Sequence, residues 1–240
     1  MRNTKPSKGK LYMIPTTLGE TEPLEVLPIS IKRIIEEIDY YIVENEKSAR
    51  RFIKKISPRK SQPNLHISLL NKFTGAEIIP SFLDPCLNGK NVGILSEAGC
   101  PGIADPGADV VRIAHQKGIV IVPLAGPSSI IMALMASGLN GQNFAFNGYL
   151  PIETAERKKA IRKFEKISRE NNQSQLFIET PYRNNNLLQE FVRTLSKTTL
   201  LCVATDITLA TEFIATKLVG DWVTDEVDLH KRPTIFIIQA

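Results

Sequence analysis

One segment of the chain, residues 96–107, has the residue types of a ligand-binding loop. It reads Ser-Glu-Ala-Gly-Cys-Pro-Gly-Ile-Ala-Asp-Pro-Gly, with three glycines and two prolines. Glycine permits backbone conformations that other residues avoid, and it lets the main chain approach a bound molecule closely. A strand-like apolar run, 91–95, precedes the segment, and a helix-like run, 108–117, follows it. We therefore predict a loop at the carboxyl end of a strand, where open α/β sheets bind their ligands.

Sequence signatures of several other kinds of site are missing. No P-loop motif for phosphate binding occurs, and Pro-Thr-Thr-Leu-Gly at 15–19 does not match the glycine pattern of dinucleotide-binding folds. Neither a serine-hydrolase motif nor the zinc-protease motif is present. The three histidines and three cysteines are scattered, so we expect neither a metal site nor a disulfide framework. No side chain stands out as a nucleophile, and the catalytic residues stay unassigned.

The overall composition is that of an ordinary soluble protein. Of the 240 residues, 42% are hydrophobic and 23% are charged. No apolar stretch approaches the length of about 18 residues that a membrane helix needs. No apolar run of signal-peptide type follows the basic amino terminus. We therefore expect a cytoplasmic protein without a membrane segment.

Positive charge is in excess, with a formal net charge of +5 and a pI near 9.1. The basic residues concentrate in three segments, 2–10, 47–60 and 157–166. Such clusters are compatible with binding of a polyanion such as RNA. They are equally compatible with solvated helix faces and a frayed terminus, so both interpretations stay open.

The first half of the chain alternates strand-like and helix-like segments. Apolar runs predict strands at 11–14, 40–43, 91–95 and 119–124. Helical spacing of apolar residues predicts helices over 31–38, 49–56 and 109–117, and a further helix over 78–87 that Pro85 interrupts. This alternation predicts a parallel, doubly wound α/β sheet. We assign residues 1–125 to an amino-terminal domain that carries the glycine-rich loop.

The pattern changes after residues 124–127. Strands are predicted at 144–149, 175–179, 200–204, 212–217 and 234–239. Helices are predicted to begin near Ser128 and Thr154, each a candidate helix cap, and a third covers 187–195. Hairpin-like connections late in the chain indicate a mixed sheet. We assign residues 126–240 to a carboxyl-terminal α/β domain with this sheet and its helices.

With these elements placed, the loop at 96–107 resembles the S-D-A-G-T-P-G-I-S-D-P-G segment of the tetrapyrrole methylase superfamily. The chain is most similar to its ribosomal RNA small subunit methyltransferase I branch, which methylates a ribose 2′-hydroxyl. Four further segments match that branch in family order: 124–129 for P-G-P-S-A, 136–139 for A-S-G-L, 146–151 for F-E-G-F-L-P and 179–183 for E-S-P-H-R. The likeness runs from about Leu11 to Ile238.

The resemblance implies a two-domain methylase fold, usually a homodimer, with S-adenosylmethionine bound in the cleft between the domains. It also implies that loop backbone groups, rather than side-chain acids, hold this cofactor. Carried over position by position, the implied cofactor contacts are Leu18, Gly99, Gly102, Ser128, Ser129, Ile178, Ala204, Pro233 and Thr234. RNA is implied as the methyl acceptor, and a ribose hydroxyl would need a proton acceptor.

Each implied contact also has a purely structural alternative. The two loop glycines can serve as turn residues, Ser128 as a helix cap, and Ile178 and Ala204 as core residues. A cap or a turn residue can contact a ligand as well, so the two roles do not exclude each other.

The chain departs from the branch mainly on the substrate side. Asn45 and Lys47 stand where the branch has an acid and an arginine, and Leu70 and Asn71 stand where it has His and Glu. The basic segment after the Leu-Pro turn is reduced to Ile-Glu-Thr at 152–154. The branch's A-R-E-L-T reads Ala-Thr-Asp-Ile-Thr at 204–208. These changes affect polar groups that would bind RNA or activate a hydroxyl, whereas the glycine-rich loops are kept.

Three functions remain open at this point. The first is a methyltransferase that acts on RNA, which the basic clusters favour. The second is a methyltransferase of the same fold that acts on a tetrapyrrole or another substrate, which the changes at Asn45, Leu70 and Asn71 favour. The third is a protein that binds S-adenosylmethionine without catalysis, which would fit intact cofactor loops without a catalytic base.

Overall fold

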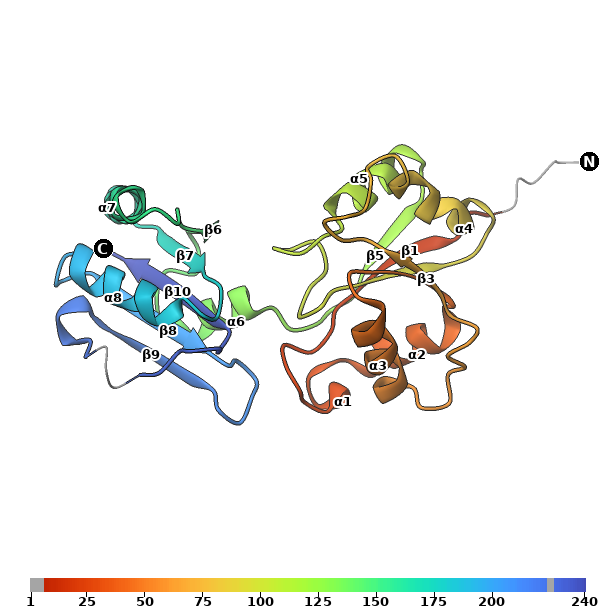
Figure 1. The fold of residues 1–240 in the computed structure, drawn as a ribbon, viewed down its shortest axis with the longest axis horizontal. Helices are drawn as coiled ribbons and strands as arrows, with labels where there is room; N and C mark the ends of the chain where they lie inside the picture. Colours follow the sequence, from red (N-terminus) through yellow and green to blue (C-terminus); the bar gives the residue numbers. More distant parts are fainter. Residues whose placement is uncertain (1–6, 224–226) are drawn as a thin grey trace, which may run out of the picture. The chain divides into compact units, whose positions relative to one another are not determined.

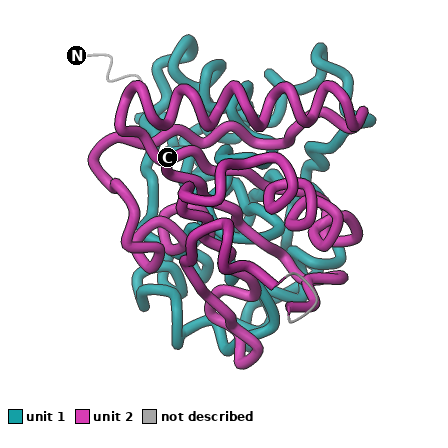
Figure 2. Tube along the Cα trace, turned by 90° about the vertical axis from the view of Figure 1, so that its left-hand side faces the viewer, with its two compact units in different colours: residues 1–128 teal, residues 129–240 magenta. Residues whose placement is uncertain are grey.

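The computed structural model describes residues 7–223 and 227–240, and it divides into two compact units (Figure 2). The first unit ends at Ser128 and the second begins at Ser129. Each unit contains a five-stranded sheet of its own with helices packed against it (Figure 1). The predicted α/β class is therefore confirmed.

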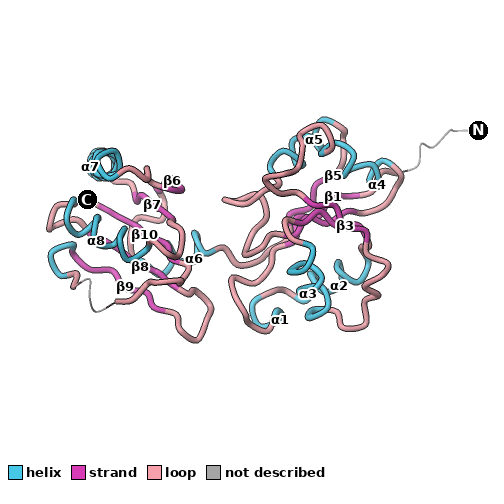
Figure 3. The backbone as a smooth tube through the Cα atoms, viewed as in Figure 1, coloured by secondary structure: helices cyan, strands magenta, loops and turns pink. Residues whose placement is uncertain are grey.

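The strands of the first sheet all run parallel, in the order β3-β2-β4-β1-β5. Figure 3 shows these strands in magenta with helices around them. Their bounds are β1 Lys10–Ile14, β2 Tyr40–Val43, β3 His66–Leu69, β4 Val92–Leu95 and β5 Val120–Pro123. The predicted parallel, doubly wound sheet is confirmed. The edge strand β3 is not predicted from the sequence, because the polar residues His66 and Ser68 break the apolar run that marks the other strands of the sheet.

Helices cover both faces of this sheet, at α1 Pro23–Val26, α2 Ile29–Glu37, α3 Glu46–Ile56, α4 Asp84–Leu87, α5 Ala108–Gln116 and a 3-10 helix, η1, at Ile79–Leu83. Successive strand residues point to opposite faces. Leu11 belongs to the core beneath η1, α4 and α5, and its neighbour Tyr12 belongs to the core beneath α2 and α3. The sheet is thus buried on both sides, as parallel sheets generally are.

The prediction of a single helix over 78–87 is wrong in one respect. The segment forms two consecutive helices, η1 and α4, rather than one helix that a proline breaks. Pro85 lies in the first turn of α4. A proline fits there because the N–H groups of the first turn have no partner within the helix.

The second sheet is mixed, with the strand order β6-β7-β10-β8-β9. The strand bounds are β6 Phe144–Tyr149, β7 Ser174–Ile178, β8 Leu200–Thr205, β9 Phe213–Leu218 and β10 Thr234–Gln239. β6 and β7 are parallel, and the other neighbours are antiparallel. The predicted mixed sheet is confirmed.

The helices of the second unit are α6 Ser129–Ser137, α7 Thr154–Asn171 and α8 Asn184–Thr194, with a 3-10 helix, η2, at Val219–Asp221. α7 and α8 share a core with the sheet, and Phe177, Phe191 and Phe236 are fully buried in it. The cap of α7 differs from the prediction. Glu153, rather than Thr154, caps the helix, and its carboxylate accepts the N–H of Glu156 at 2.7 Å. A carboxylate also interacts favourably with the positive end of the helix dipole.

We expect Phe191→Ala to lower the free energy of unfolding of the second unit by about 3–5 kcal/mol. The Phe191 ring lies 5.6 Å from the ring centroids of both Phe177 and Phe236, so its removal leaves a cavity in the core. Phe73→Ala is the control, because that side chain is 83% exposed. Scanning calorimetry measures both variants. Equal shifts of the unfolding transition would contradict the expectation.

Candidate functional site

The carboxyl ends of β1 and β4 meet where the connections of the first sheet change direction. β1 leads through α1 and α2 to β2 on one side, whereas β4 leads through α5 to β5 on the other. Open α/β sheets bind ligands in the crevice at such a switch point. The loop at 96–107 starts there, directly after β4.

Hydrogen bonds join this loop to the segment that follows β1, and we call them the Thr16–Gly99 link. The carbonyl oxygen of Gly99 accepts the N–H of Thr16 at 2.9 Å and the hydroxyl of Ser96 at 2.5 Å. The hydroxyls of Thr16 and Ser96 lie 3.3 Å apart, and both side chains are buried. The turn at Gly99 is therefore fixed from two sides.

Four residues of the loop at 96–107 have a positive φ angle. Gly99, Gly102 and Gly107 have φ of +74°, +78° and +134°, and Ala104 has +59°. Side chains are strained in this region, which explains the glycines. A Cβ atom on Gly102 would have its nearest neighbour, the Cε of Met13, at an ordinary 3.7 Å. A side chain at Gly102 would therefore be strained by its φ and not by a clash with its neighbours.

Leu18 and Gly99, two of the predicted cofactor contacts, lie close together. A Cβ atom on Gly99 would stand 3.0 Å from Cδ2 of Leu18 and 3.2 Å from the carbonyl oxygen of Pro127. The neighbouring Gly126 packs against Pro15, since a Cβ atom there would stand 2.2 Å from the proline Cγ. Three loops of the first unit therefore converge at Gly99.

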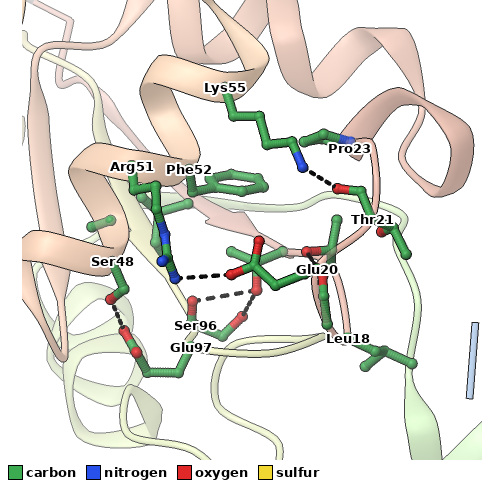
Figure 4. A pocket seen from close by; sticks show the side chains of 15 residues that line it. Leu18, Glu20, Thr21, Pro23, Ser48, Arg51, Phe52, Lys55, Ser96 and Glu97 are labelled. Carbon is green, nitrogen blue, oxygen red and sulfur yellow. Dashed lines mark hydrogen bonds and ion pairs between the residues drawn. The ribbon is translucent and has the colours of Figure 1, made fainter. Parts of the chain in front are cut away.

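An open pocket adjoins the Thr16–Gly99 link (Figure 4). The segment after β1, including Leu18, forms one wall, and α3 forms another. Arg51 of α3 pairs with Glu20 at 3.0 Å, and Lys55 donates to the carbonyl oxygen of Thr21 at 2.7 Å. These contacts tie the two walls together.

Three carboxyl groups lie in the segments that follow β2 and β4. Glu44 and Asp105 line a very small cavity, whereas Glu97 lines the open pocket and accepts a hydrogen bond from Ser48 at 2.6 Å. Burial, and then the negative charges of Glu44 and Glu97, raise the pKa of Asp105 to about 6. The Oδ2 atom of Asp105 is shielded from solvent and has no hydrogen-bond partner in the described part of the chain. This carboxylate could therefore accept a proton near neutral pH.

Asn45, one of the departures from the family pattern, has a structural role. Its side-chain oxygen accepts the N–H groups of Lys47 at 2.9 Å and Ser48 at 3.3 Å, which caps α3. Asparagine and aspartate serve about equally well as helix caps. The asparagine thus provides a cap without adding a negative charge beside Glu44.

Four of the predicted contacts meet at one edge of the second sheet. Ile178 of β7 and Ala204 of β8 both pair with Ile235 of β10. Pro233 and Thr234 come directly before Ile235 in the chain. Ala204 is fully buried and Thr234 is 5% exposed. Their side chains therefore belong to the core, and any contact with a ligand would fall to their backbone groups.

Two ion pairs that sequence analysis does not predict hold the loops at this edge. Arg183 pairs with Glu179 at 2.6 Å, and the Glu179 side chain is 2% exposed. Arg232 pairs with Asp206 at 2.7 Å. The first pair lies within the segment 179–183, which is a loop before α8, so helical spacing does not predict it. The second joins residues that are 26 positions apart, so only the strand order reveals it.

Ser128 and Ser129 stand on either side of the division between the two units, and Ser129 begins α6. The nine predicted contacts therefore form three groups. Leu18, Gly99 and Gly102 lie at the carboxyl edge of the first sheet, Ile178, Ala204, Pro233 and Thr234 lie at one edge of the second, and the two serines lie at the division.

The described residues show no sign of a metal site or a membrane-spanning helix. Within 7–223 and 227–240, no group of three or more His, Cys, Asp or Glu residues could hold a metal ion. In the same ranges, no helix has the length and apolar character to cross a membrane. Cys86, Cys100 and Cys202 are free thiols.

Known proteins are similar in sequence to this chain over most of its length. The model of the family described as Tetrapyrrole (Corrin/Porphyrin) Methylases matches residues 10–221. A relative from Escherichia coli O157:H7 named Ribosomal RNA small subunit methyltransferase I is 26% identical over 98% of this chain and 79% of its own length. A relative of the same name from Streptococcus pyogenes serotype M6 is 30% identical over 77% of this chain. That match spans only 60% of the streptococcal protein.

Solved structures share the fold. The methyltransferase CobJ matches with a TM-score of 0.63 at 13% identity, and the match covers 96% of this chain and 94% of CobJ. The cobalt precorrin-4 methyltransferase CbiF matches with a TM-score of 0.61 at 16% identity, with the same coverage. At these identities the likeness shows the fold alone. Together with the family match, it confirms the predicted resemblance: the chain belongs to the tetrapyrrole (corrin/porphyrin) methylase family, and it is a methyltransferase of the S-adenosylmethionine-dependent kind.

Proposed function

We propose that the chain transfers a methyl group from S-adenosylmethionine to RNA, with a ribose 2′-hydroxyl of ribosomal RNA as the acceptor. The loop at 96–107 carries the proposal, because its glycines expose backbone at the switch point of the first sheet. The names of the relatives from Escherichia coli and Streptococcus pyogenes support the acceptor. The net charge of +5 is favourable for binding RNA.

The residues of the loop fit the cofactor. The backbone N–H groups of Ala98, Gly99 and Gly102 donate to no other group in the described part of the chain. Free amides on a turn of this kind bind carboxylates and hydroxyls, which S-adenosylmethionine carries. When bound, the cofactor supplies an electrophilic methyl group. The task of the chain is to hold the acceptor in line with that group.

The remaining predicted contacts complete this proposal. We assign Leu18, Ser128 and Ser129 to the cofactor site together with the loop glycines, and Ile178, Ala204, Pro233 and Thr234 to its wall in the second unit. The family resemblance supports the view that the units are domains with the cofactor between them, and that two chains form a homodimer. A ribosomal RNA substrate would place the protein in the cytoplasm.

A ribose hydroxyl must lose its proton as it accepts the methyl group. We assign the proton to Asp105, because its carboxyl group has a raised pKa and lies in the same loop as Gly99 and Gly102. A pKa of about 6 leaves this group ionised and moderately basic at neutral pH. Glu44 shares the cavity with Asp105 and helps to raise that pKa by its charge.

The proposal predicts that the purified chain transfers labelled methyl groups to RNA. The assay offers labelled S-adenosylmethionine with small-subunit ribosomal RNA, total RNA or tetrapyrroles. We expect label in the ribosomal RNA and at a ribose oxygen. Label in tetrapyrroles alone would support the second function, and cofactor binding without any transfer would support the third.

We expect Gly99→Ala to weaken S-adenosylmethionine binding about tenfold, because the added Cβ atom would press on Leu18 and Pro127 at 3.0 and 3.2 Å and displace the loop. The strain of a side chain at positive φ lowers stability with or without the cofactor, and the control shares it. Gly118→Ala is the matched control. Its φ of +60° gives similar strain, but its Cβ would meet only the Lys8 Nζ at 3.5 Å. Calorimetric titration measures both variants, and equal affinities would remove the loop from the site.

The raised pKa of Asp105 predicts two pH effects. Ionising this group opposes folding, so its stabilising contribution is present at low pH and is lost as the pH rises through about 6. We expect Asp105→Asn to raise the free energy of unfolding at pH 8 by roughly 1 kcal/mol, allowing for solvent screening, and by less at pH 4. Denaturant titrations at the two pH values measure this difference.

The same substitution tests the role of Asp105 in catalysis. Methyl transfer by the unmodified chain is expected to rise as the pH passes about 6, and Asp105→Asn should abolish that rise. Glu97→Gln is the control, because removing a neighbouring negative charge should move the rise to lower pH without abolishing it. An unchanged pH profile in Asp105→Asn would show that another group accepts the proton.

A further inference from the structure

The long helix α7 carries a row of cations along its exposed side. Lys158, Lys159, Arg162, Lys163, Lys166 and Arg169 fall within an arc of about 140° around the helix axis. The opposite side, with Ile161 fully buried, packs into the core of the second unit. From residue 158 to residue 169 the row is about 16 Å long, enough to face several phosphates of a nucleic-acid backbone.

The acids of α7 leave most of this row without an ionic partner. Glu156 pairs with Lys159 at 2.7 Å, and Glu170 pairs with Lys166 at 3.7 Å. Glu165 faces away and accepts hydrogen bonds from the backbone N–H of Ser196 and the hydroxyl of Thr199. Across the described ranges, no ion pair or hydrogen bond engages the side chains of the remaining four cations, Lys158, Arg162, Lys163 and Arg169.

The other basic helix, α3, differs in this respect. Arg50 pairs with Glu46 at 2.8 Å, Arg51 with Glu20 at 3.0 Å, and Lys55 with Glu22 at 3.3 Å. Most of the positive charge of α3 is therefore paired within the first unit, where two of the ion pairs join α3 to the segment after β1. A polyanion would have to displace these acids from α3, whereas the four cations of α7 are already available.

The row also begins at the edge of the second sheet that holds the predicted contacts. β6, β7 and β8 run in the same direction, so their carboxyl ends, with Ile178 and Ala204, share one edge. α7 starts five residues after the end of β6, and it leads away from that edge. A strand of RNA that approaches this edge could follow the helix.

We infer that Lys158, Arg162, Lys163 and Arg169 form a docking surface for the phosphate backbone of the RNA substrate, which we call the α7 cation row. The inference rests on the proposed function, because it takes RNA as the acceptor. It assigns the row to binding and orientation of RNA and gives it no part in cofactor binding. Exposed cations without partners attract phosphates without reading sequence, so their contribution should depend strongly on salt.

The test compares two pairs of arginines in the full chain. Arg162→Gln/Arg169→Gln removes two charges from the row, and glutamine is as good a helix former as arginine. Arg33→Gln/Arg59→Gln removes two exposed arginines that have no ion pair among the described residues. Anisotropy of a fluorescein-labelled RNA stem–loop gives the dissociation constant over a series of KCl concentrations. S-adenosylmethionine affinity is measured alongside by calorimetry.

We expect the α7 pair to raise the dissociation constant about tenfold at low salt and to lower the slope of its salt dependence by about two. Cofactor affinity should not change, and Arg162→Lys/Arg169→Lys should restore RNA binding because it keeps the charge. Equal losses in the Arg33/Arg59 pair, or no loss in the α7 pair, would overturn the inference while leaving the RNA proposal intact. No RNA binding by the unmodified chain would overturn both.

Discussion

The Thr16–Gly99 link is the constraint on which the rest of the first unit's site depends. It joins the segments that follow two neighbouring strands, and it does so through the backbone carbonyl of a residue with φ of +74°. A residue with a side chain at this position would be strained and would press on Leu18. Thr16 and Ser96 of the link line the open pocket, and the amide of Gly102 and the position of Asp105 follow from the path that the loop takes after this turn.

Sequence patterns predict most elements and both sheet types because strands and helices bury their apolar residues at regular intervals. They fail where an element lacks regular apolar spacing, and where a contact joins residues that are far apart in the sequence. The edge strand β3 lacks an apolar run because His66 and Ser68 are polar, and Pro85 can begin a helix as readily as it can end one. The Asp206–Arg232 pair depends on β8 and β10 becoming neighbours, which local spacing does not encode. The loop glycines could be identified from sequence, whereas the raised pKa of Asp105 required the packing around it.

The residues at which the chain departs from the pattern of the ribosomal RNA methyltransferase I branch have different physical consequences. Asn45 caps α3 as an aspartate would, so this change alters charge and leaves the backbone supported. Leu70 is 7% exposed and belongs to the core beneath η1, α4 and α5, so it offers no polar group to a substrate. The cations of the two basic helices also differ. Three cations of α3 form ion pairs within the first unit, whereas four cations of α7 have no ion pair among the described residues.

The contact of Gly126 with Pro15 couples two distant parts of the sequence. A Cβ atom at position 126 would overlap the proline ring, with only 2.2 Å to its Cγ. Relief would require the ring to move, and Pro15 directly precedes Thr16, whose N–H makes the link to Gly99. Evolutionary change at these two positions is therefore expected to be correlated: lineages that acquire a side chain at 126 should also replace the proline at 15, and an isolated substitution at either site should be rare.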